Sequence, residues 1–523
     1  MNWRGVIPTM TTAFNPEMTV DHVFIPKHAR SRVDNGCNGL VALGSLGESA
    51  TLNFDGKVAI LKTLVAELKG KPVLSSWCRR KSAWGANAYA GRASFWPEPS
   101  AKPRLRRSGT RWRSGPGFRC LRQIPLILRA KPSIVFLLIV CCGTPRVSGG
   151  TFHAGKLAAM DAAIAQAIAA RQCPGGVLWV EHNGVAYHKA YGHRAMVPAP
   201  EPMTEDTIFD AASLTKVTAG TPAVLLLVER GLVKLDAPVQ TYIPEFKGDG
   251  KEAITVRQLL THTSGLRPDI ETSSDWQGQG VAVEKACAEK LQSVPGSAFK
   301  YSDINFFLLG EIVQRVSRTP LEVFVQREFY GPLKMADTGF LPSKDKVPRI
   351  APTEVVNGTP WRGVVHDPTA RHMGGVAGHA GLFTTASDLA QYARMLLNLG
   401  ELDGVRIFKP ETVRLMTGVQ TPPKISARRG FGWDIDSSFS GPRGEVFPVG
   451  SYGHTGWTGT SIWIDPFSKT FVIFLSNRNH PTEKGSVSSL RHTLGTLAAE
   501  AVADFDFSQT PAPRHSATNA VPR

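Results

Sequence analysis

The sequence predicts an α/β protein, in the α+β arrangement of a sheet domain interrupted by a helical domain, behind the beginning of a second α/β fold. Apolar periodicity from residue 151 onward gives the order helix, hairpin, long helical stretch, strands and helix. Residues 1–75 instead alternate strand, helix, strand and helix, as α/β folds do. Charge separates the same two parts, because residues 1–150 carry 23 Lys and Arg against 7 Asp and Glu in a chain of net charge +17.

Four segments are expected from these shifts in composition. Residues 1–75 form a strand and helix unit, residues 76–150 a basic junction, residues 151–507 the main domain and residues 508–523 a disordered tail. The junction is rich in Arg, Gly, Pro and Ser and lacks the ordered basic and aromatic pattern of a nucleic-acid site. A disordered linker is one interpretation, and a scrambled junction from a rearranged gene is another. We expect no nucleic-acid partner.

A signal-like segment lies inside the junction, at residues 129–143. It has a basic start, about ten apolar residues and a small-residue exit, which resembles a signal peptide and is too short to span a bilayer. A short buried strand explains the same residues equally well. The segment implies a periplasmic or secreted origin for the domain after it, whereas its internal position implies a cytoplasmic product, so the location stays open. No stable membrane span is expected.

The first 75 residues carry a second set of features. A strand is expected at residues 5–14 and another at 39–43, before a tight turn at 44–48 and a helix at 55–69. This part resembles the dihydrodipicolinate synthase and N-acetylneuraminate lyase family of (β/α)8 barrels. The resemblance implies carboxylate binding by hydroxyl side chains in that turn, where Ser45 matches and Leu46 does not. Nothing after Ser75 supplies the family's Schiff-base lysine or its tyrosine, so we expect a truncated barrel fragment without lyase activity.

The main domain is expected to open with a helix near residues 157–172 and a hairpin of residues 177–182 and 185–191 about Asn183-Gly184. Asn-Gly favours a two-residue hairpin turn because both positions tolerate positive φ. A long apolar helix is expected from residue 214 to 229. Further helical stretches, strands and a closing helix complete the domain; they are expected at residues 306–324, 453–465, 470–476 and 487–505.

Ser213 lies on the first turn of the apolar helix, and Lys216 follows three positions later on the same face. A lysine can accept a serine proton only if burial or neighbouring cations keep its amine neutral. Ser-x-x-Lys also occurs at Ser297 and Ser343, which lie in an expected turn and loop. From these residues alone, a catalytic serine and an ordinary N-terminal helix serine are both open.

Two further motifs come after Ser213-Leu-Thr-Lys216 in order: Tyr301-Ser-Asp303 and His454-Thr-Gly456. Together with the runs at 259–265 and 374–383, they resemble the serine β-lactamase and penicillin-binding-protein superfamily, near its class C and family VIII carboxylesterase branch. The resemblance covers residues 154 to about 507. It implies an antiparallel sheet flanked by helices, with a helical domain, and an enzyme that needs no cofactor.

The resemblance also implies residue roles. Ser213 would attack an ester or amide carbonyl to give an acyl-enzyme, while Lys216 and Tyr301 pass the proton, the phenol acting as base if cations lower its pKa. His454 would complete the catalytic set. The backbone N–H groups of Ser213 and Trp457 would hold the oxyanion, Trp457 lying on the strand at 453–465. The other substrate-binding positions would be Asp303, Thr455 and Gly456.

Two positions depart from the family pattern. His454 replaces a lysine that is always charged, and Asp303 replaces an amide, so one fixed cation and one donor are lost. Both departures favour esters or relaxed substrates over carboxylated β-lactams. The expected partners are therefore a small-molecule ester, a β-lactam or a peptidoglycan peptide, with the acyl donor and the oligomeric state left open.

Metal chemistry is not expected. No His-Glu-x-x-His motif or cysteine zinc pattern occurs, and His262, His366 and His379 are interpreted as loop or core residues. Two other classes remain as alternatives to a serine hydrolase of the β-lactamase and esterase type. One is a pyruvate-dependent lyase acting through residues 1–73, and the other is a catalytically inactive protein that binds penicillin or peptidoglycan.

Overall fold

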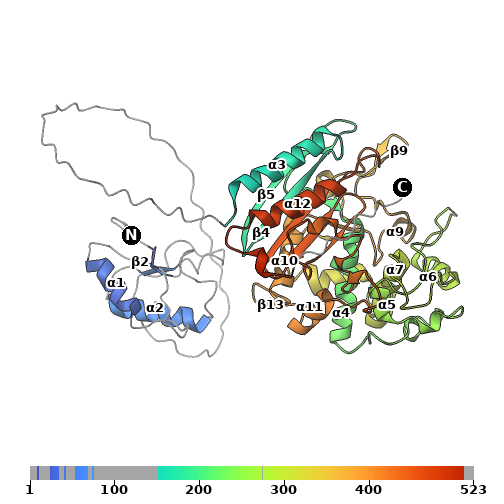
Figure 1. The fold of residues 1–523 in the computed structure, drawn as a ribbon, viewed down its shortest axis with the longest axis horizontal. Coiled ribbons are helices and arrows are strands. Elements are labelled where there is room, and N and C mark those ends of the chain that lie inside the picture. Colours follow the sequence, from blue (N-terminus) through green and yellow to red (C-terminus); the bar gives the residue numbers. More distant parts are fainter. Residues whose placement is uncertain are drawn as a thin grey trace, which may run out of the picture. The chain divides into compact units, whose positions relative to one another are not determined.

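The computed structural model describes residues 9–10, 24–34, 40–42, 54–68, 73–75, 151–273 and 275–511 (Figure 1). The chain divides into two units, Met1–Phe136 and Leu137–Arg523. The predicted junction, its signal-like segment and the tail beyond residue 511 lie outside the described residues. Among the residues described, no helix has the length and apolar character needed to cross a membrane.

The first unit contains a small parallel sheet. Its strands are β1 (Thr9–Met10), β2 (Leu40–Ala42) and β3 (Val73–Ser75), with β2 in the centre. Helices α1 (Phe24–Asp34) and α2 (Phe54–Leu68) alternate with them. The predicted order of strand, helix, strand and helix is confirmed. Two strands were expected in this part, and the structure has a third, β3, whose residues 73–75 pair in parallel with β2.

The second unit is built on an eight-stranded sheet whose neighbouring strands are antiparallel. The N-terminal hairpin joins the C-terminal strands through β4 and β18, which pair from Gly176 with Ser476 to His182 with Thr470. The predicted antiparallel sheet is confirmed. In spatial order its strands are β14 (Arg428–Arg429), β15 (Asp434–Asp436), β16 (Tyr452–Thr455), β17 (Ser461–Asp465), β18 (Thr470–Ser476), β4 (Gly175–His182), β5 (Val185–Ala195) and β6 (Glu201–Pro202).

Helices cover both faces of this sheet (Figure 1). Because side chains alternate along a strand, Leu178 and Val180 of β4 pack in the cluster that contains α3 (Ala154–Ala169) and α12 (Ser488–Ala501). Val177 enters the larger cluster with α10 (Ala386–Leu397). The turn between β4 and β5 has φ of 49° at Asn183 and 81° at Gly184, so the predicted hairpin is confirmed.

A mainly helical segment lies in the sequence between strands β4–β6 and strands β14–β18 of the large sheet. The apolar helix α4 (Thr221–Glu229) is buried along most of its length and packs against α7 (Asp303–Ser317), which explains why it lacks a polar face. Its other helices are α5 (Val256–Leu260), α6 (Gln279–Ala288), α8 (Leu321–Val325), α9 (Pro368–His372) and α11 (Pro410–Thr417). Small strands complete the unit: β7 (Phe209–Asp210), β8 (Gly339–Phe340), β9 (Val355–Val356), β10 (Thr359–Pro360), β11 (Leu382–Thr384), β12 (Glu401–Leu402) and β13 (Val405–Arg406).

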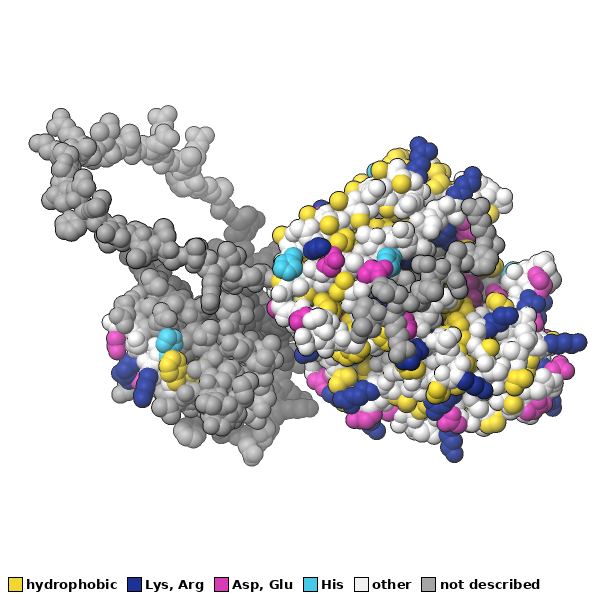
Figure 2. Space-filling view, viewed as in Figure 1, with side chains coloured by type: hydrophobic (Ala, Val, Ile, Leu, Met, Phe, Trp, Pro, Cys, Tyr) yellow, Lys and Arg dark blue, Asp and Glu magenta, His cyan; other side chains and the backbone are white. Residues whose placement is uncertain are grey.

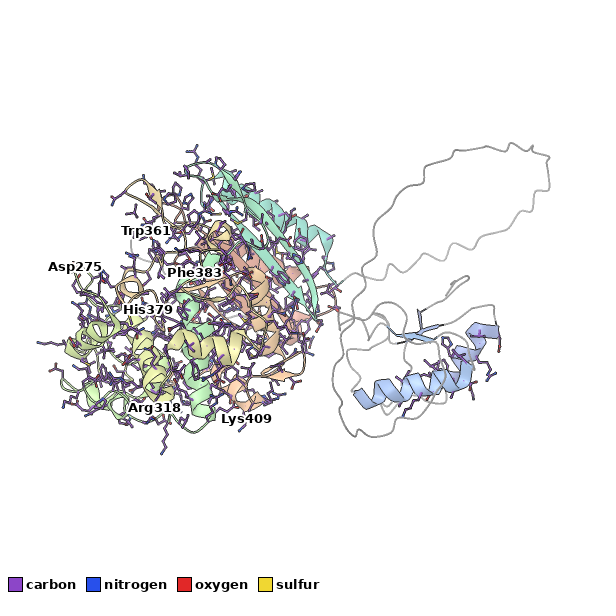
Figure 3. The ribbon with its side chains drawn as sticks, turned by 180° about the vertical axis from the view of Figure 1, so that it is seen from behind. Asp275, Arg318, Trp361, His379, Phe383 and Lys409 are labelled. Atoms are coloured by element: carbon purple, nitrogen blue, oxygen red, sulfur yellow. The ribbon has the colours of Figure 1, made fainter. Side chains whose placement is uncertain are left out.

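The visible surface of this unit carries side chains of both charges, in agreement with its neutral charge balance, whereas its interior is mostly apolar. In Figure 2, Lys and Arg side chains are interspersed with Asp and Glu over the visible face. In Figure 3, His379 and Phe383 lie in the interior, where their exposed fractions are 0% and 2%. The buried His379 belongs to the polar region around Ser213, because its carbonyl oxygen accepts from Lys216.

Candidate active site

The segment that carries Ser213 is helical but irregular. A 3₁₀ turn at Ala212–Leu214 leads into a π-helical turn at Lys216–Gly220 and then into α4. The predicted helix is therefore confirmed as one continuous helical stretch, with its first turns rewound. Gly220 allows this packing, because a Cβ there would lie 2.5 Å from the carbonyl oxygen of Gly378.

The backbone before Ser213 is held in an unusual conformation. Ala212 has φ of +48°, a value that costs energy for a residue with a Cβ. The Asp210 carboxylate compensates, because its two oxygens accept the backbone N–H groups of Ala212 and His366, each at 2.8 Å. Asp210 thus fixes the turn that presents Ser213, a role that no sequence motif indicated.

The end of β16 packs against the same turn. The Thr460 hydroxyl donates to the Ala211 carbonyl at 3.0 Å, and Gly456 N–H donates to the Thr460 carbonyl at 2.7 Å. A Cβ on Gly456 would lie 2.5 Å from the Ala211 carbonyl oxygen, so only glycine fits without a shift. Tertiary packing therefore brings the His-Thr-Gly motif to Ser213 across more than 200 residues of chain.

Lys216 points at Ser213, as the spacing predicts. Its Nζ lies 3.0 Å from Ser213 Oγ, 3.2 Å from the His379 carbonyl oxygen and 2.5 Å from Asp303 Oδ1. Burial alone lowers the pKa of Lys216, but the Asp303 carboxylate and the Tyr301 hydroxyl outweigh burial and raise it. The condition stated for Lys216 to accept the serine proton, a neutral amine, is therefore not met in the resting site, because the Asp303 carboxylate lies where the family has an amide.

Tyr301 lies beside Lys216, whose Nζ is 4.9 Å from the centre of its ring. The ring stacks between His262 at 4.4 Å and Phe439 at 5.2 Å. Burial raises the pKa of Tyr301 more than Lys216 and Ser213 lower it, and Asp303 raises it further. The condition for the phenol to act as a base is therefore not met: Lys216 lowers the pKa of Tyr301, but burial raises it more, and the phenol is a proton donor in the resting site.

His454 is 5% exposed and lies on β16 in the same pocket. Its Nδ1–H donates to the Thr455 carbonyl at 2.8 Å. Burial, Arg429 and Lys216 together hold the pKa of His454 well below its ordinary value. The imidazole is therefore neutral at pH 7, in agreement with the weak pull on carboxylates that its sequence position predicts.

A cavity of about 330 Å³ opens at Ser213. It brings together the predicted Ser213, Tyr301, His454, Thr455, Gly456 and Trp457, whereas Lys216 and Asp303 lie behind its wall. Trp457 is 62% exposed and occupies the turn after β16, so its predicted placement on a strand is wrong. Its role in the oxyanion site stays a prediction. Residues of this pocket that sequence reasoning missed are Arg429, Asp434, Phe439, Arg478, Ser486, Val487, Ser488 and Arg491.

Three of the missed residues are arginines with different surroundings. Arg429 is buried and pairs with Asp434 at 2.9 Å, so its charge is neutralised. Arg478 lies over the Trp457 ring at 4.8 Å and donates from Nε to the Trp457 carbonyl at 2.8 Å. Arg491, on the first turn of α12, donates from Nη2 to the carbonyls of Gly456 and Thr460, both at 2.7 Å.

Arg491 differs from the fully buried Arg429 because no carboxylate pairs with it among the described residues. Burial and the neighbouring Arg478 lower its pKa to about 9, and its buried Nε has no hydrogen-bond partner in that part of the chain. A half-buried guanidinium without a counter-ion favours the binding of an anion beside it. One sequence signal was available, namely an arginine between Leu490 and Leu494 on the apolar side of α12.

The three histidines interpreted as loop or core residues are accounted for. His262 packs on Tyr301, and its Nδ1 accepts the Ser302 N–H at 3.1 Å. His379 Nε2 pairs with Asp367 Oδ1 at 2.9 Å. His366 Nε2 lies 3.0 Å from Glu354 Oε2 and 3.3 Å from Glu483 Oε1, which makes an ion-pair cluster with ligand atoms close enough together for a metal ion.

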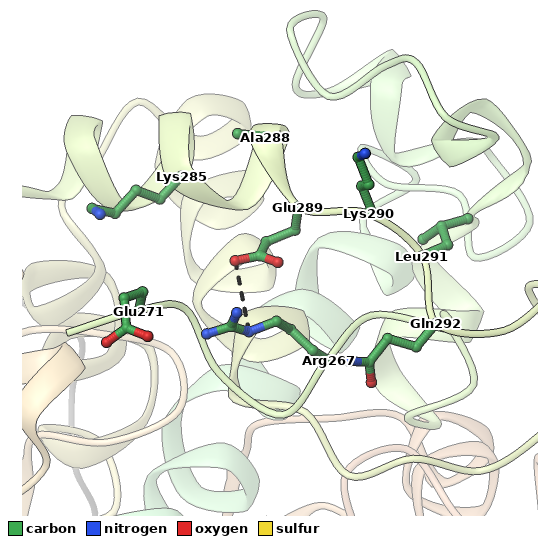
Figure 4. Close-up of a pocket in the computed structure, with 8 residues that line it drawn as sticks. All are labelled: Arg267, Glu271, Lys285, Ala288, Glu289, Lys290, Leu291 and Gln292. Atoms are coloured by element: carbon green, nitrogen blue, oxygen red, sulfur yellow. Dashed lines mark ion pairs between the residues drawn. The ribbon is translucent and has the colours of Figure 1, made fainter. Parts of the chain in front are cut away.

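A second cavity, of about 490 Å³, lies apart from Ser213 (Figure 4). Its wall is formed mostly by charged and polar chains of the α6 region, including Arg267 and Glu289, whose Nε and Oε1 are 3.7 Å apart. It contains neither a nucleophile nor a general base beside one. Although larger, this cavity is not where the predicted chemistry lies.

A serine paired with a buried lysine, on an antiparallel sheet with a helical insert, defines a serine hydrolase. The chain belongs to the β-lactamase family, whose model, described as Beta-lactamase, matches residues 160–494. A model described as the dihydrodipicolinate synthetase family matches residues 2–76. The sequence therefore carries a serine hydrolase of the β-lactamase family, preceded by residues that resemble part of a lyase-type barrel.

Individual relatives agree with this assignment. A putative D-alanyl-D-alanine carboxypeptidase of Escherichia coli (strain K12) is 32% identical in an alignment of length 367 that covers 63% of this chain and 84% of the relative. A class C β-lactamase structure has a TM-score of 0.56 at 22% identity, over 67% of this chain and 98% of that one. The hydrolase EstCE1 has a TM-score of 0.54 at 22% identity, over 66% and 99%. These structures share the fold.

Proposed function

We propose that the protein hydrolyses acyl donors through an acyl-enzyme on Ser213, and that its preferred donors carry a carboxylate next to the scissile bond. The observation that carries the proposal is Arg491, a half-buried arginine in the wall of the cavity that opens at Ser213, whose Nε is buried without a hydrogen-bond partner among the described residues. A D-alanyl peptide ends in such a carboxylate. The relatives named putative D-alanyl-D-alanine carboxypeptidase support this class of substrate.

The site residues have distinct roles in this reaction. Ser213 Oγ attacks the carbonyl carbon, and the displaced electron pair becomes an oxyanion held by the backbone N–H groups of Ser213 and Trp457. Tyr301 is protonated and lies beside Ser213, which suits it to donate a proton to the leaving group. Thr455 and Gly456 form the floor against which the substrate lies. Water then opens the acyl-enzyme.

The charge on the cavity wall supports a carboxylated substrate. The sequence suggested a preference for uncharged esters because His454 cannot supply the family's fixed cation. Arg491 and Arg478 offer positive charge in the same cavity from other segments, and guanidinium groups bind carboxylates in two-point geometry. The loss of charge at position 454 is thus offset by arginines from α12 and from the loop after β18.

Hydrolysis of uncharged esters is a second candidate. It is favoured by one observation, the neutral and buried His454, which provides no fixed charge beside the nucleophile. The two candidates differ in what they require of Arg491. A carboxylate-specific site depends on its charge, whereas an ester site does not.

The class of reaction is tested by a fluorophosphonate probe, which should label the wild-type protein and not Ser213→Ala. The substrate is tested by comparing an N-acyl-D-Ala-D-Ala peptide with its C-terminal amide. We expect kcat/KM for the acid to exceed that for the amide at least tenfold, and Arg491→Gln to narrow this ratio. Equal rates for acid and amide would favour the ester candidate, and penicillin binding without turnover would favour a binding protein.

A further inference from the structure

Asp303 contacts the catalytic lysine and not the open cavity. The family has an amide at this position, and substrate binding was its predicted role. Asp303 Oδ1 is buried and lies 2.5 Å from Lys216 Nζ. Asp303 is not among the residues that line the cavity at Ser213. It begins α7, where the backbone N–H groups of the first turn favour a negative charge.

The groups around Lys216 Nζ determine where a proton of its ammonium can go. Its Nζ faces Ser213 Oγ, the His379 carbonyl and Asp303 Oδ1, at 3.0, 3.2 and 2.5 Å. An ammonium has three protons and no acceptor; here it donates to Ser213 Oγ and the His379 carbonyl and forms an ion pair with Asp303. It cannot accept the proton of Ser213 until it has released one. A backbone carbonyl does not accept a proton in this way, and the neighbouring Tyr301 hydroxyl already carries one, which leaves Asp303.

We propose that Asp303 is the proton store for Lys216, so that the serine is activated by a relay from Ser213 through Lys216 to Asp303. As Ser213 Oγ bonds to the carbonyl carbon, its proton passes to Lys216 Nζ, and a different proton passes from Nζ to Asp303 Oδ1. The carbonyl electron pair moves onto oxygen. When the leaving group departs with a proton from Tyr301, Lys216 reprotonates Tyr301 and Asp303 returns its proton to Lys216, so the ion pair is restored. This inference rests on the proposed function.

The step moves one negative charge within the site, from Asp303 to the oxyanion. Before it, Lys216 and Asp303 form an ion pair; after it, Asp303 is neutral, and Lys216 is still an ammonium that faces the new negative charge at short range. Other titratable groups face the pair from neighbouring elements. They are Tyr301 just before α7, His262 after α5, His454 on β16, His379 after α9, Asp269 in the loop after α5, and Asp367 behind His379. These groups are present in both the wild type and a variant at position 303, so a difference between the two pH profiles reports on Asp303.

The test is the pH dependence of kcat/KM for a p-nitrophenyl ester, which reports acylation of the free enzyme. With the relay, the wild type needs no free amine, so we expect less than a threefold change between pH 7 and 9. In Asp303→Asn the lysine must lose its proton to water first. Its rate should then rise with pH over this range, by up to tenfold per unit. Asp269→Asn, a matched change that does not touch Lys216, should keep the wild-type profile.

Several outcomes would overturn the relay. The first is that Asp303→Asn shows the same pH dependence of kcat/KM as the wild type. The second is that kcat/KM of the wild type itself rises tenfold per pH unit from pH 7 to 9. The second outcome needs no variant, so it holds even if Asp303→Asn fails to give a normal thermal melt. Activity that persists in Ser213→Ala would overturn both the proposed function and the relay. Loss of activity in Ser213→Ala with an unchanged Asp303→Asn profile would overturn the relay alone.

Discussion

Gly456 approaches Ala211 so closely that a Cβ on Gly456 would lie 2.5 Å from the Ala211 carbonyl oxygen. This contact joins the His-Thr-Gly strand to the turn that holds Ser213, although the two are far apart in the sequence. The position of the nucleophile relative to the strand therefore depends on the absence of one methyl group.

Gly456→Ala should force the two segments apart. We expect a loss of about 1 to 3 kcal/mol in the free energy of unfolding, as in other overpacked sites, and at least a tenfold fall in kcat/KM. Urea unfolding and ester hydrolysis measure the two effects. Gly155→Ala is the matched control, because a Cβ there meets nothing within 4 Å and the position lies on α3. Equal behaviour of the two variants would contradict the close contact.

Restoring the family residues should change substrate preference. In His454→Lys with Asp303→Asn, a fixed cation and an amide donor return to the site, and each such contact is typically worth about 1 to 3 kcal/mol. The ratio of kcat/KM for benzylpenicillin over that for a short-chain p-nitrophenyl ester should rise. A ratio that does not move would mean that cavity shape sets the preference.

Acid should destabilise the protein partly through Asp367. Burial raises the pKa of this carboxyl, but the charge and hydrogen bond of His379 outweigh burial and lower it to about 2. A carboxyl with a depressed pKa stabilises the fold above its unfolded value, near 3.8, and loses that effect as pH falls toward 2. The contribution is about 1 to 2 kcal/mol after allowance for partial solvent access.

Measurements of unfolding free energy at several pH values test this. Between pH 5 and 2.5 the wild type should lose more stability than Asp367→Asn, because the variant has no proton to gain at that site. The exposed Asp504→Asn serves as a control for removing a carboxylate elsewhere in the same unit. Parallel acid curves for the wild type and Asp367→Asn would contradict the assignment.

The N-terminal unit should show no lyase chemistry. The barrel family forms a Schiff base between a lysine and pyruvate, and the match to that family ends at residue 76. Borohydride treatment in the presence of pyruvate should leave no stable adduct on the protein, as judged by intact mass. An adduct on a lysine would revive the alternative of a pyruvate-dependent lyase.

Residues 151–507 should form a resistant core. We propose this boundary because the periodic elements, the motifs and the neutral charge balance all begin after residue 150. Limited proteolysis should cut between about residues 76 and 150 and leave a fragment that keeps Ser213 reactive toward the probe. Cleavage within residues 151–507 before the junction is cut would show that the boundary is misplaced.

The sequence by itself predicted the main helices and strands and indicated Ser213 as the candidate nucleophile. Helix α3, the hairpin about Asn183 and Gly184, and the pairing of Ser213 with Lys216 all rest on local spacing along the chain. The order of the Ser213, Tyr301 and His454 motifs also indicated the family. These features involve residues near one another in sequence or patterns that recur along an element, and such signals survive without coordinates.

Only the tertiary structure decided the state of the site. Burial and the Asp303 carboxylate act on Lys216 in opposite directions, and the spacing of the motif cannot say which prevails. Arg491 belongs to no motif and reaches the cavity only because α12 packs behind β17 and β18. The pKa of a buried group depends on what surrounds it in space, so the charge of this active site is a property of packing.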